Sequence, residues 1–562
     1  MNEGTTGGPL VTGARLLVDQ LRLHGVERIF CVPGESFMAV LDELYDTSDI
    51  KVVTCRHEGG AAMMAEAYGK LTGRPGIAFV TRGPGATNAS AGIHVAHQDS
   101  TPMLLFIGQI ERTVTERGAF QEINYRAMFS PLAKWATQID DGRRTAEIVS
   151  RAFHLASSGR PGPVVVALPE DMLIERAAAV PARPYQRIQA GLTSEDCEAI
   201  GRAVRSADRP IVVVGGGGWS SQAAHDAMQF AERWDLPIIA SFRCQDYVDN
   251  THRSYVGNLG LGANPALLAA VREADLILAV GARLGEISSN GYSLLRIPCP
   301  EQDLIHMHPD PDEIGRVYQP TLGIIAGSES TFRHLAAAEP PRERPWASRT
   351  RKLRDAYLDW TAPPAVVGPV QMGEIMGYLR ERLPADAIVT NGAGNFAIWP
   401  NRYHRYRTYR SMLAPVSGSM GYGIPAAVAA KIQFPGRLVV AFAGDGDILM
   451  TGQELATAVK ENAPILIVLL NNNMYGTIRM HQERAYPGRV TATTLVNPDF
   501  IRFAESFGAF AERITKTDQF SGAFERAVAS QKVALLEIII DPEIISPTDT
   551  ITSLRKRKRP TN

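Results

Sequence analysis

The chain has 562 residues, 45% of them hydrophobic and 21% charged, and this length predicts several hydrophobic cores rather than one. The 58 Lys and Arg residues nearly balance the 59 Asp and Glu residues. The resulting formal net charge of −1 gives no reason to expect a nucleic acid or an anionic membrane as partner. The five cysteines are scattered without a C-x-x-C pair, which argues against both a disulfide framework and a thiolate metal site.

The two ends of the sequence contain no segment typical of secretion or membrane insertion. Residues 1–10 lack a basic region followed by an apolar core, and no apolar run of the chain reaches the roughly 18 residues of a membrane span. The basic run at 555–559 is interpreted as a solvated tail. We therefore expect a cytoplasmic protein with neither a nucleic acid nor a membrane as partner.

The first third of the chain alternates short apolar runs with helical stretches. The runs are continuous, as expected of strands buried on both faces, and they lie at 29–32, 52–55, 77–81, 103–107 and 164–168. Between two of them, residues 59–71 place Ala61, Met64, Ala65 and Tyr68 on one helical stripe. This order of elements predicts a doubly wound parallel sheet.

The same pattern recurs twice, each time after a break. Polar, proline-containing residues 181–189 precede a second set of runs, at 211–214, 238–240, 276–280 and 304–307. Residues 339–368, rich in Pro and Arg and interpreted as a linker with a surface helix, precede a third set, at 388–390, 438–443, 465–470 and 535–540. We predict an α/β protein with three doubly wound parallel-sheet domains, at 1–182, 190–338 and 365–548.

The most informative polar residues follow two apolar runs of the third domain. Gly444-Asp445-Gly446 comes after one run and Asn471-Asn472 after the next, with a predicted helix at 451–460 between them. Because this unit is βαβ, both polar sites are expected at the carboxyl edge of the sheet, where such folds bind ligands. A carboxylate and an amide there suit Mg²⁺ held against phosphates, and a helix that begins at Gly446 and Asp447 favours an anion.

With 24 residues between them, these two segments form the thiamine-diphosphate-binding motif. From about Thr12 to about Ser546 the chain resembles the thiamine-diphosphate family that includes acetolactate synthase, benzaldehyde lyase, benzoylformate decarboxylase and oxalyl-CoA decarboxylase, and acetolactate synthases in particular. The resemblance implies a pyrimidine-binding, a central and a diphosphate-binding domain, in this order. It also implies that Asp445, Asn472 and the main-chain carbonyl of Met474 hold the metal.

The cofactor-binding residues that the resemblance implies in the third domain are Gly394, Asn395, Phe396, Gly418, Met420, Gly444, Asp445, Gly446, Asp447, Asn472, Met474, Tyr475 and Gly476. The main chain of Gly418 and Met420 would bind the aminopyrimidine edge, and the Met420 side chain would support the bent cofactor. From the residues alone, Met420 is otherwise an ordinary core residue. Acetolactate synthases usually have Gln and His at Asn395 and Phe396, so we expect backbone contacts there rather than the usual side-chain contacts.

Glu58 is the cofactor-binding and catalytic residue expected in the first domain. It follows the run at 52–55 and is flanked by Gly, Ala and Met residues, a setting that predicts a desolvated carboxyl group in a protonated or proton-sharing state. The resemblance implies that Glu58 contacts N1′ of the aminopyrimidine and promotes its imino tautomer. The alternative from the residues alone is an exposed glutamate at a helix N-terminus.

Four further residues are predicted to be catalytic and to face the substrate: Gln121, Glu35, Ser36 and His481. Gln121 matches a glutamine that acetolactate synthase and benzaldehyde lyase place beside thiazolium C2; it is either a hydrogen-bond donor to a substrate carbonyl or a surface-loop residue. Acetolactate synthases have small residues at Glu35 and Ser36. Glu35 is therefore either a proton-transfer group in the pocket or the cap of a helix that begins near residue 37.

Two more departures from acetolactate synthases concern the second substrate. His481 replaces a tryptophan that shapes the acceptor site in many acetolactate synthases. The identity of the acceptor substrate is therefore not predicted from the resemblance. Arg82 stands where a serine is usual, and it is either the partner of a carboxylate or a solvated arginine.

The glycine run at 215–218 in the central domain follows a predicted strand but is not a dinucleotide fingerprint. Some relatives bind FAD or ADP in this domain and others bind no nucleotide, so FAD or ADP stays open and is not favoured. The resemblance also implies active sites shared between chains, with Glu58 and Asp445 of one site on different subunits. A homodimer or a dimer of dimers is therefore expected.

The leading functional hypothesis is carboligation, in which a 2-oxo acid loses CO₂ and the remaining fragment joins an acceptor carbonyl. The second is simple decarboxylation, or lysis of a 2-hydroxy ketone or 2-hydroxyacyl-CoA, with the same cofactor. A non-catalytic relative is disfavoured because Glu58, Asp445 and Asn472 are all present, and a nicotinamide-dependent reductase would require a fingerprint that the chain lacks. The sequence thus predicts an enzyme that depends on thiamine diphosphate and Mg²⁺ and acts on a small 2-oxo acid or 2-hydroxy ketone.

Overall fold

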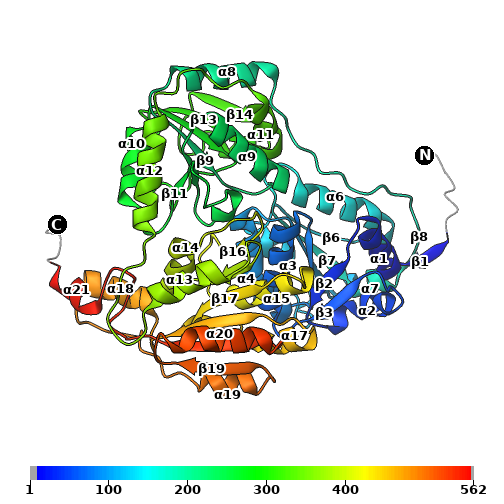
Figure 1. Ribbon diagram of the computed structural model, residues 1–562. Helices are drawn as coiled ribbons and strands as arrows, with labels where there is room; N and C mark the ends of the chain where they lie inside the picture. The colour runs from blue at the N-terminus through cyan, green and yellow to red at the C-terminus, as the bar shows by residue number, and fades with distance from the viewer. Residues whose placement is uncertain (1–8, 558–562) are drawn as a thin grey trace. The chain divides into compact units, whose positions relative to one another are not determined.

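The computed structural model describes residues 9–557 and divides into two compact units, Met1–Ile188 and Gln189–Asn562. The described residues form three six-stranded sheets in which all neighbouring strands are parallel, one sheet in the first unit and two in the second. This confirms the prediction of three parallel-sheet α/β domains (Figure 1). The expectations for residues 1–8, and for Lys558 and Arg559 of the basic run, lie outside the described residues.

The first unit is a doubly wound sheet with a small antiparallel pair beside it. Its strands are β1 (Leu10–Thr12), β2 (Arg28–Cys31), β3 (Lys51–Thr54), β4 (Gly76–Val80), β5 (Met103–Gln109), β6 (Trp135–Gln138), β7 (Pro163–Pro169) and β8 (Arg176–Ala178). Its helices are α1 (Gly13–Leu23), η1 (Glu35–Phe37), α2 (Met38–Tyr45), α3 (Glu58–Thr72), α4 (Pro84–Asp99), η2 (Arg112–Val114), α5 (Tyr125–Phe129), η3 (Gly142–Arg144), α6 (Thr145–Ser157) and α7 (Glu170–Ile174). The main sheet has the order β3-β2-β4-β5-β7-β6, and β1 pairs with β8.

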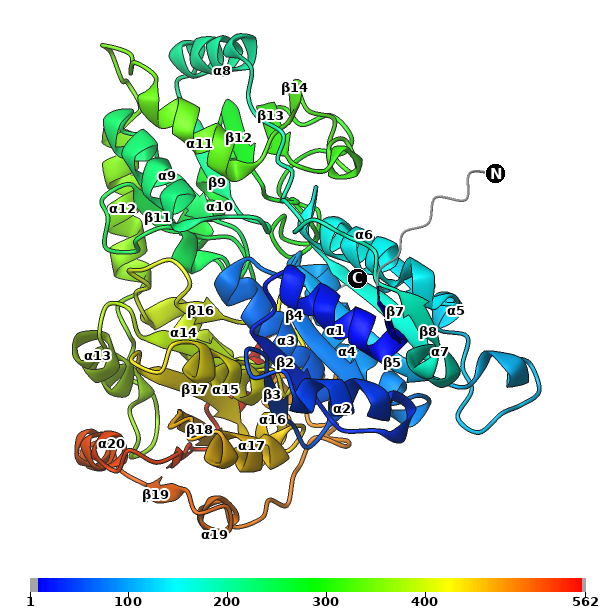
Figure 2. The same ribbon diagram turned by 90° about the vertical axis from the view of Figure 1, so that its right-hand side faces the viewer.

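Helices cover both faces of this sheet. The apolar stripes of α1, α2 and α6 pack on one face in a shared core (Figure 2). On the other side, α3 and α4 pack against each other and against β4 and β5. The two helices approach closely because their contact residues are small: a Cβ on Gly92 of α4 would lie only 2.4 Å from the Cβ of Ala62 of α3. The predicted helix at 59–71 is confirmed, and it is buried on nearly all sides rather than along one stripe.

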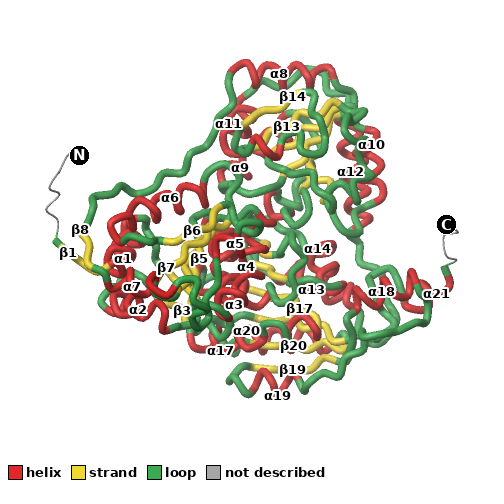
Figure 3. Tube along the Cα trace, turned by 180° about the vertical axis from the view of Figure 1, so that it is seen from behind, coloured by secondary structure: helices red, strands yellow, loops and turns green. Residues whose placement is uncertain are grey.

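The second unit begins with the central sheet. Its strands are β9 (Pro210–Val214), β10 (Ile238–Ala240), β11 (Tyr255–Asn258), β12 (Leu276–Val280), β13 (Asp303–His308) and β14 (Leu322–Ile325), in the order β11-β10-β9-β12-β13-β14. The helices are α8 (Ser194–Ser206), α9 (Ser221–Arg233), η4 (Gln245–Tyr247), α10 (Pro265–Glu273), η5 (Pro311–Glu313) and α11 (Ser328–Ala337). Helices α9 and α11 pack on one face and α10 on the other. The predicted break at 181–189 is a stretch without helix or strand between β8 and α8 (Figure 3).

The third sheet carries most of the predicted site. Its strands are β15 (Ile388–Asn391), β16 (Met412–Leu413), β17 (Val439–Gly444), β18 (Leu466–Asn471), β19 (Phe510–Ile514) and β20 (Ala534–Ile539), in the order β16-β15-β17-β18-β20-β19. Its helices are α13 (Met372–Arg382), η6 (Asn395–Ala397), α14 (Ile398–Tyr403), α15 (Gly423–Gln433), α16 (Asp445–Ile448), η7 (Gly452–Glu454), α17 (Leu455–Lys460), α18 (Gly476–Ala485), α19 (Phe500–Glu505), α20 (Gln519–Ala529) and α21 (Ile551–Lys556). Asp246 of the central domain accepts hydrogen bonds from the backbone N–H groups of Ser411 and Met412, which links the two sheets of this unit.

The linker between the second and third domains carries α12 (Ala347–Trp360), as predicted, but this helix is more than a surface helix. Thr350, Leu353 and Tyr357 are buried against the central domain, and Arg354 donates a hydrogen bond to the carbonyl oxygen of Tyr255 on β11 at 2.8 Å. The linker helix is therefore part of the central domain's packing.

The C-terminal basic run is only partly described, and its described part corrects the expectation of a solvated tail. Arg555, on α21, donates to both carboxylate oxygens of Glu483, and Arg557 donates to Asp549 at 2.5 Å. These arginines fasten the end of the chain to the third domain.

Two further observations concern composition. None of the five cysteines, all of which lie within residues 9–557, forms a disulfide. Within residues 9–557, no helix combines the length and the apolar character that a membrane crossing requires.

Candidate cofactor site

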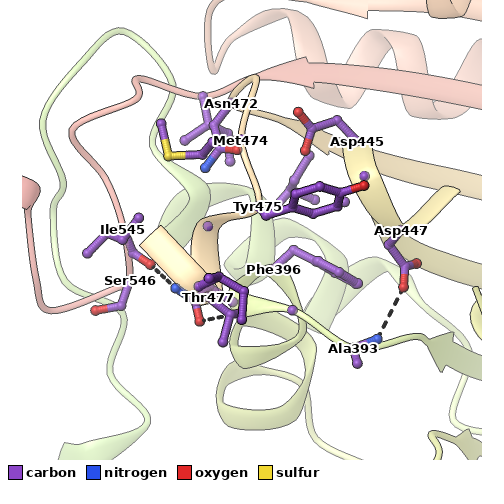
Figure 4. A pocket seen from close by; sticks show the side chains of 18 of the residues that line it. Ala393, Phe396, Asp445, Asp447, Asn472, Met474, Tyr475, Thr477, Ile545 and Ser546 are labelled. Atoms are coloured by element: carbon purple, nitrogen blue, oxygen red, sulfur yellow. Dashed lines mark hydrogen bonds between the residues drawn. The ribbon is translucent and has the colours of Figure 1, made fainter. Parts of the chain in front are cut away.

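A cavity of about 240 Å³ lies at the carboxyl ends of β15, β17, β18 and β20. Every residue of the third domain that the sequence predicts to bind the cofactor lines this cavity, from Gly394 to Gly476 (Figure 4). The reason is topological: the carboxyl ends of neighbouring parallel strands meet at one edge of the sheet, so motifs far apart in sequence converge there. The wall also contains residues that no motif indicated, namely Ala393, Trp399, Leu470, Thr477, Ile478, Ile540, Ile544, Ile545 and Ser546.

Asp445 is the buried carboxylate of this cavity. It begins α16 directly after β17 and is 2% exposed. One carboxylate oxygen accepts a hydrogen bond from Nδ2 of Asn497 at 2.8 Å. Burial nevertheless raises the pKa of Asp445, because the charged form loses its hydration. A divalent cation beside Asp445 would supply the opposite charge that the carboxylate lacks, so this position fits a metal ligand.

The consecutive asparagines after β18 have different roles. Asn471 is buried, and its amide donates to Glu537 at 2.8 Å, so it is a structural residue. Asn472 lines the cavity, as does Met474 (Figure 4). Within residues 9–557, no group of three His, Cys, Asp or Glu side chains is placed to hold a metal ion. A metal in this cavity would therefore use one carboxylate together with amide and main-chain oxygens, which are ligands that Mg²⁺ accepts.

Asn497 is a residue of the site that sequence reasoning missed. Its Nδ2 lies within hydrogen-bond distance of Asp445 and also of the side-chain oxygens of Asn471 and Asn473, both at 3.1 Å. It thereby joins the turn after β17 to the turn after β18. Asn497 lies in an irregular stretch and follows no apolar run, so no local pattern indicated it.

Two aromatic rings lie against the glycine turn at 444–446. A Cβ on Gly444 would lie 2.7 Å from the ring of Phe396, and a Cβ on Gly446 would lie 2.4 Å from the ring of Tyr475. Glycine is needed at both positions because larger residues would displace these rings. Phe396 therefore lines the site with an apolar face, whereas the side chain of Asn395 donates to the carbonyl oxygen of Ile545 at 2.6 Å.

Asp447 is a second buried carboxyl group at the cavity. Its Oδ1 accepts a hydrogen bond from the backbone N–H of Ala393 at 3.2 Å (Figure 4) and another from the backbone N–H of Gly421 at 2.9 Å. Its Oδ2 is buried and has no hydrogen-bond partner among the described residues. Burial raises the pKa of Asp447 to about 7. The side chain thus fastens the Ala393 and Gly421 loops to α16.

We expect Asp447 to stabilise the cofactor-free protein at low pH and to lose this contribution as the pH rises from about 4 to about 7, so Asp447→Asn should gain stability relative to the wild type over this range. The folded-state pKa of Asp447 lies above the unfolded value of 3.8, so the folded state binds the proton more tightly. The resulting stabilisation is complete below the unfolded pKa and is lost as the pH rises through about 7. The shift of about three pKa units corresponds to at most about 4 kcal/mol. Urea unfolding of both proteins at about pH 5 and pH 8 measures it, and an equal pH dependence in Asp447→Asn would contradict the assignment.

In the first unit, Glu58 is the first residue of α3 and is half-buried. Its Oε2 accepts a hydrogen bond from Nδ2 of Asn88 on α4 at 2.9 Å. Glu58 therefore does stand at a helix N-terminus, as the alternative interpretation holds, and this position is compatible with the cofactor role. The desolvation expected from the sequence is only partial in the single chain, so the proton-sharing state of Glu58 stays a prediction.

The structure places Glu35 and Ser36 differently. Glu35 is exposed and forms an ion pair with Arg82 at 3.1 Å, and Arg82 also pairs with Glu170 at 3.1 Å. Arg82 is 7% exposed, so the interpretation of Arg82 as a solvated arginine is wrong. Ser36 is fully buried, and its hydroxyl lies 2.9 Å from Oγ1 of Thr81, so a role of Ser36 toward a substrate stays a prediction. The helix-cap interpretation of Glu35 is also wrong, because α2 has no side-chain cap.

The other two predicted substrate-facing residues lie in different settings. Gln121 is half-buried with a φ of +65°, and a Cβ on Gly83 would lie 2.7 Å from its Cβ, so it packs beside the turn that begins α4. His481 is exposed on α18 and is not among the residues that line the cavity; Ile478 of the same helix lines it instead. Roles of Gln121 and His481 toward a substrate stay predictions.

The glycine run of the central domain is packed against aromatic side chains. The indole N–H of Trp219 donates to the carbonyl oxygen of Gly215 at 2.8 Å. The hydroxyl of Tyr247 donates to the carbonyl oxygen of Gly216 at 2.7 Å. The two rings lie 4.9 Å apart, and Trp219 is 2% exposed. In these contacts the backbone of the glycine run lies directly against the two aromatic side chains, which explains the run as a structural turn. Neither FAD nor ADP is part of the proposed cofactor set.

The fold and the cavity together define a class of protein: a multidomain α/β protein with a site suited to a phosphate-bearing cofactor and a divalent cation. Comparison with protein families makes the class specific. The thiamine pyrophosphate enzyme models match residues 11–128 (N-terminal TPP binding domain), 197–335 (central domain) and 392–538 (C-terminal TPP binding domain). The chain therefore belongs to the thiamine pyrophosphate enzyme family, and its TPP binding domains support thiamine diphosphate as the cofactor.

Similar proteins extend over most of the chain. The acetolactate synthase large subunit of Parasynechococcus marenigrum is 33% identical in an alignment of 545 positions that covers 94% of this chain and 87% of that protein. The acetolactate synthase isozyme 2 large subunit of Escherichia coli is 31% identical, over 94% of this chain and 96% of that protein. The probable acetolactate synthase large subunit of Methanocaldococcus jannaschii is 31% identical, over 94% and 92%. The chain is thus an acetolactate synthase-like member of the family.

Proposed function

We propose that this chain is a thiamine-diphosphate- and Mg²⁺-dependent enzyme that removes CO₂ from a 2-oxo acid and joins the remaining fragment to an acceptor carbonyl. The observation that carries the proposal is the cavity at the carboxyl edge of the third sheet, which is lined by every cofactor-binding residue expected in that domain. The names of its relatives, acetolactate synthase large subunits, support carboligation as the reaction.

The residues of the cavity have distinct proposed roles. The side chains of Asp445 and Asn472 and the main-chain carbonyl of Met474 would hold Mg²⁺ against the diphosphate. Gly418 and Met420, which also line the cavity, would hold the aminopyrimidine end. Bound thiamine diphosphate supplies an electron sink for the charge that decarboxylation leaves behind. Glu58 would hold and move a proton at N1′ of the aminopyrimidine, and Gln121 would orient a substrate carbonyl.

The assembly is part of the proposal. We infer a homodimer or a dimer of dimers in which Glu58 of one chain and Asp445 of another serve the same site, and a cytoplasmic location. The first unit contains Glu58, the expected partner of the aminopyrimidine, and the third domain contains Asp445, the expected metal ligand at the diphosphate. Symmetric dimers are the commonest assemblies of soluble proteins.

A second candidate is decarboxylation without carboligation, or lysis of a 2-hydroxy ketone or 2-hydroxyacyl-CoA. The observation that favours it is Glu35, an exposed carboxylate near the carboxyl edge of the first sheet that Arg82 holds in place. A carboxyl group beside the substrate can deliver a proton to the donor fragment, which then leaves as an aldehyde.

The test of the proposed function is to offer a panel of 2-oxo acids, alone and with acceptor carbonyls, with thiamine diphosphate and Mg²⁺, and to identify the products by mass. We expect CO₂ release that requires both cofactors, and a product whose mass equals the donor fragment plus the acceptor. Products that contain the donor fragment alone would support the second candidate. No cofactor-dependent turnover of any 2-oxo acid or 2-hydroxy ketone would contradict both.

A further inference from the structure

The C-terminal segment of the chain forms one wall of the proposed cofactor site, although no motif includes it. Ile544, Ile545 and Ser546 line the cavity. The carbonyl oxygen of Ile545 accepts the hydrogen bond from Asn395, and Oδ1 of Asn395 accepts another from the hydroxyl of Thr477 at 2.9 Å (Figure 4). Asn395 therefore joins the C-terminal segment to the start of α18, directly after the proposed metal-binding loop.

The same segment packs against the metal-binding loop through apolar side chains. The buried cluster consists of Met474, Met480, Ile545, Ile551 and Leu554. Met474, whose carbonyl is a proposed metal ligand, thus belongs to the same buried apolar cluster as Ile551 and Leu554 of the C-terminal helix α21. Residues near the end of the chain contribute to the shape of this loop.

A buried carboxylate fastens α21 to α18. Glu483 of α18 has a side chain that is 1% exposed, and its two oxygens accept hydrogen bonds from Arg555 of α21 at 2.7 and 2.8 Å. Arg479 donates to it at 2.8 Å, and the backbone N–H of Gly488 donates at 2.9 Å. The Arg555 guanidinium and these donors hold the pKa of Glu483 at about 2. A buried charge with this many partners keeps the two helices in one arrangement, side by side in Figure 1.

We propose that Glu483 is a positioning residue for the cofactor site. By fixing α21 on α18, it holds the wall at 544–546 and the loop at 472–476 in the shape that binds Mg²⁺ and diphosphate. This inference rests on the proposed function, because it concerns the affinity of the cavity for that cofactor. Side chains that orient the ligands of a metal without touching it typically change metal affinity by about 10–100-fold when they are replaced.

The test compares cofactor binding to the full-length Glu483→Gln chain with binding to the wild type. Calorimetric titrations with thiamine diphosphate at fixed Mg²⁺, and with Mg²⁺ at fixed thiamine diphosphate, should show affinities lower by about tenfold in the variant. Arg555→Met should show a similar loss, and the double variant should lose no more than either single variant, because both changes break the same contact. Glu525→Gln, which breaks the exposed ion pair with Arg382 in the same domain, is the matched control and should bind within about twofold of the wild type.

A second readout does not depend on cofactor. Limited proteolysis of the cofactor-free proteins should release the C-terminal segment faster from Glu483→Gln and Arg555→Met than from Glu525→Gln. If Glu483→Gln does not fold, Arg555→Met carries the test, since its side chain is partly exposed.

Unchanged affinity in both Glu483→Gln and Arg555→Met would overturn the inference, as would an equal loss in the control. Failure of the wild type to bind thiamine diphosphate would overturn the proposed function, and this inference with it.

Discussion

The Asp445→Ala chain is expected to lose Mg²⁺-dependent binding of thiamine diphosphate, with an affinity lower by at least about 100-fold. The substitution removes the only carboxylate among the three proposed metal ligands, and it removes one of the hydrogen-bond acceptors of the Asn497 amide. Replacing residues that merely orient a metal ligand already costs about 10–100-fold, so removing a direct ligand should cost at least as much. Calorimetry with thiamine diphosphate, with and without Mg²⁺, measures the effect.

The matched control is Asp518→Ala, which removes an exposed carboxylate at the start of α20 in the same domain. This variant should bind thiamine diphosphate as the wild type does. Wild-type affinity in Asp445→Ala, with the same dependence on Mg²⁺, would show that the metal is held elsewhere or is not needed.

The Glu58→Gln chain is expected to keep cofactor binding and to lose turnover by about 10²–10⁴-fold, the usual contribution of a general acid or base. Glutamine has the same size and can still accept the hydrogen bond from Asn88. An amide cannot exchange a proton with N1′ of the aminopyrimidine, so activation of the cofactor should slow. Hydrogen–deuterium exchange at thiazolium C2 of the bound cofactor measures this step directly.

Exchange at C2 should slow in Glu58→Gln by a factor comparable to the loss of turnover, whereas Glu147→Gln, an exposed substitution on α6, should change neither rate. Exchange at the wild-type rate in Glu58→Gln would show that another residue has the acid–base role, and Glu35 would be the next candidate.

Mixing the Glu58→Gln and Asp445→Ala chains tests the proposed assembly. If sites are shared between chains, hybrid dimers should regain activity, and no recovery despite proven exchange of subunits would contradict the shared site.

The interior of each sheet could be predicted from the sequence, but most of the edges could not. Every interior strand matches a predicted apolar run to within two residues at each end, because a strand with neighbours on both sides and helices on both faces needs a continuous apolar sequence. The unpredicted strands are β1, β6, β8, β11, β14, β16 and β19, and each is at the edge of its sheet. An edge strand pairs on one side only and tolerates polar residues, as in Phe510–Ile514, where most residues are only partly buried.

In the candidate site, residues within short sequence motifs could be predicted, whereas residues that contact the site from distant parts of the sequence could not. Asp445, Asn472 and Gly418 could be predicted because each lies in a short motif that follows a strand or begins a helix. Asn497, which bonds Asp445 across 52 positions of sequence, could not, because its contact depends on how the chain folds back over the sheet edge. Glu483 was missed for the same reason: as a sequence feature it is an ordinary charged helix residue, and only its burial against α21 distinguishes it.

The substrate-facing predictions depended on resemblance alone, and the residues concerned differ in burial. Ser36 matches a position that relatives keep small, but here its hydroxyl is used inside the first unit, beside Thr81. Glu35, next to it, keeps an exposed carboxylate. Neighbouring positions in one motif can therefore differ in burial, and resemblance by itself does not distinguish them.

The most direct measurement is an experimental structure of the full chain with thiamine diphosphate and Mg²⁺ bound. We predict the metal at about 2.0–2.1 Å from oxygens of Asp445, Asn472 and the Met474 carbonyl, with the diphosphate in the cavity beside the glycine turn at 444–446. The aminopyrimidine should lie against Gly418 and Met420, and its N1′ should face Glu58 of a neighbouring chain. A cofactor bound outside this cavity, or a metal without Asp445 among its ligands, would contradict the proposed site.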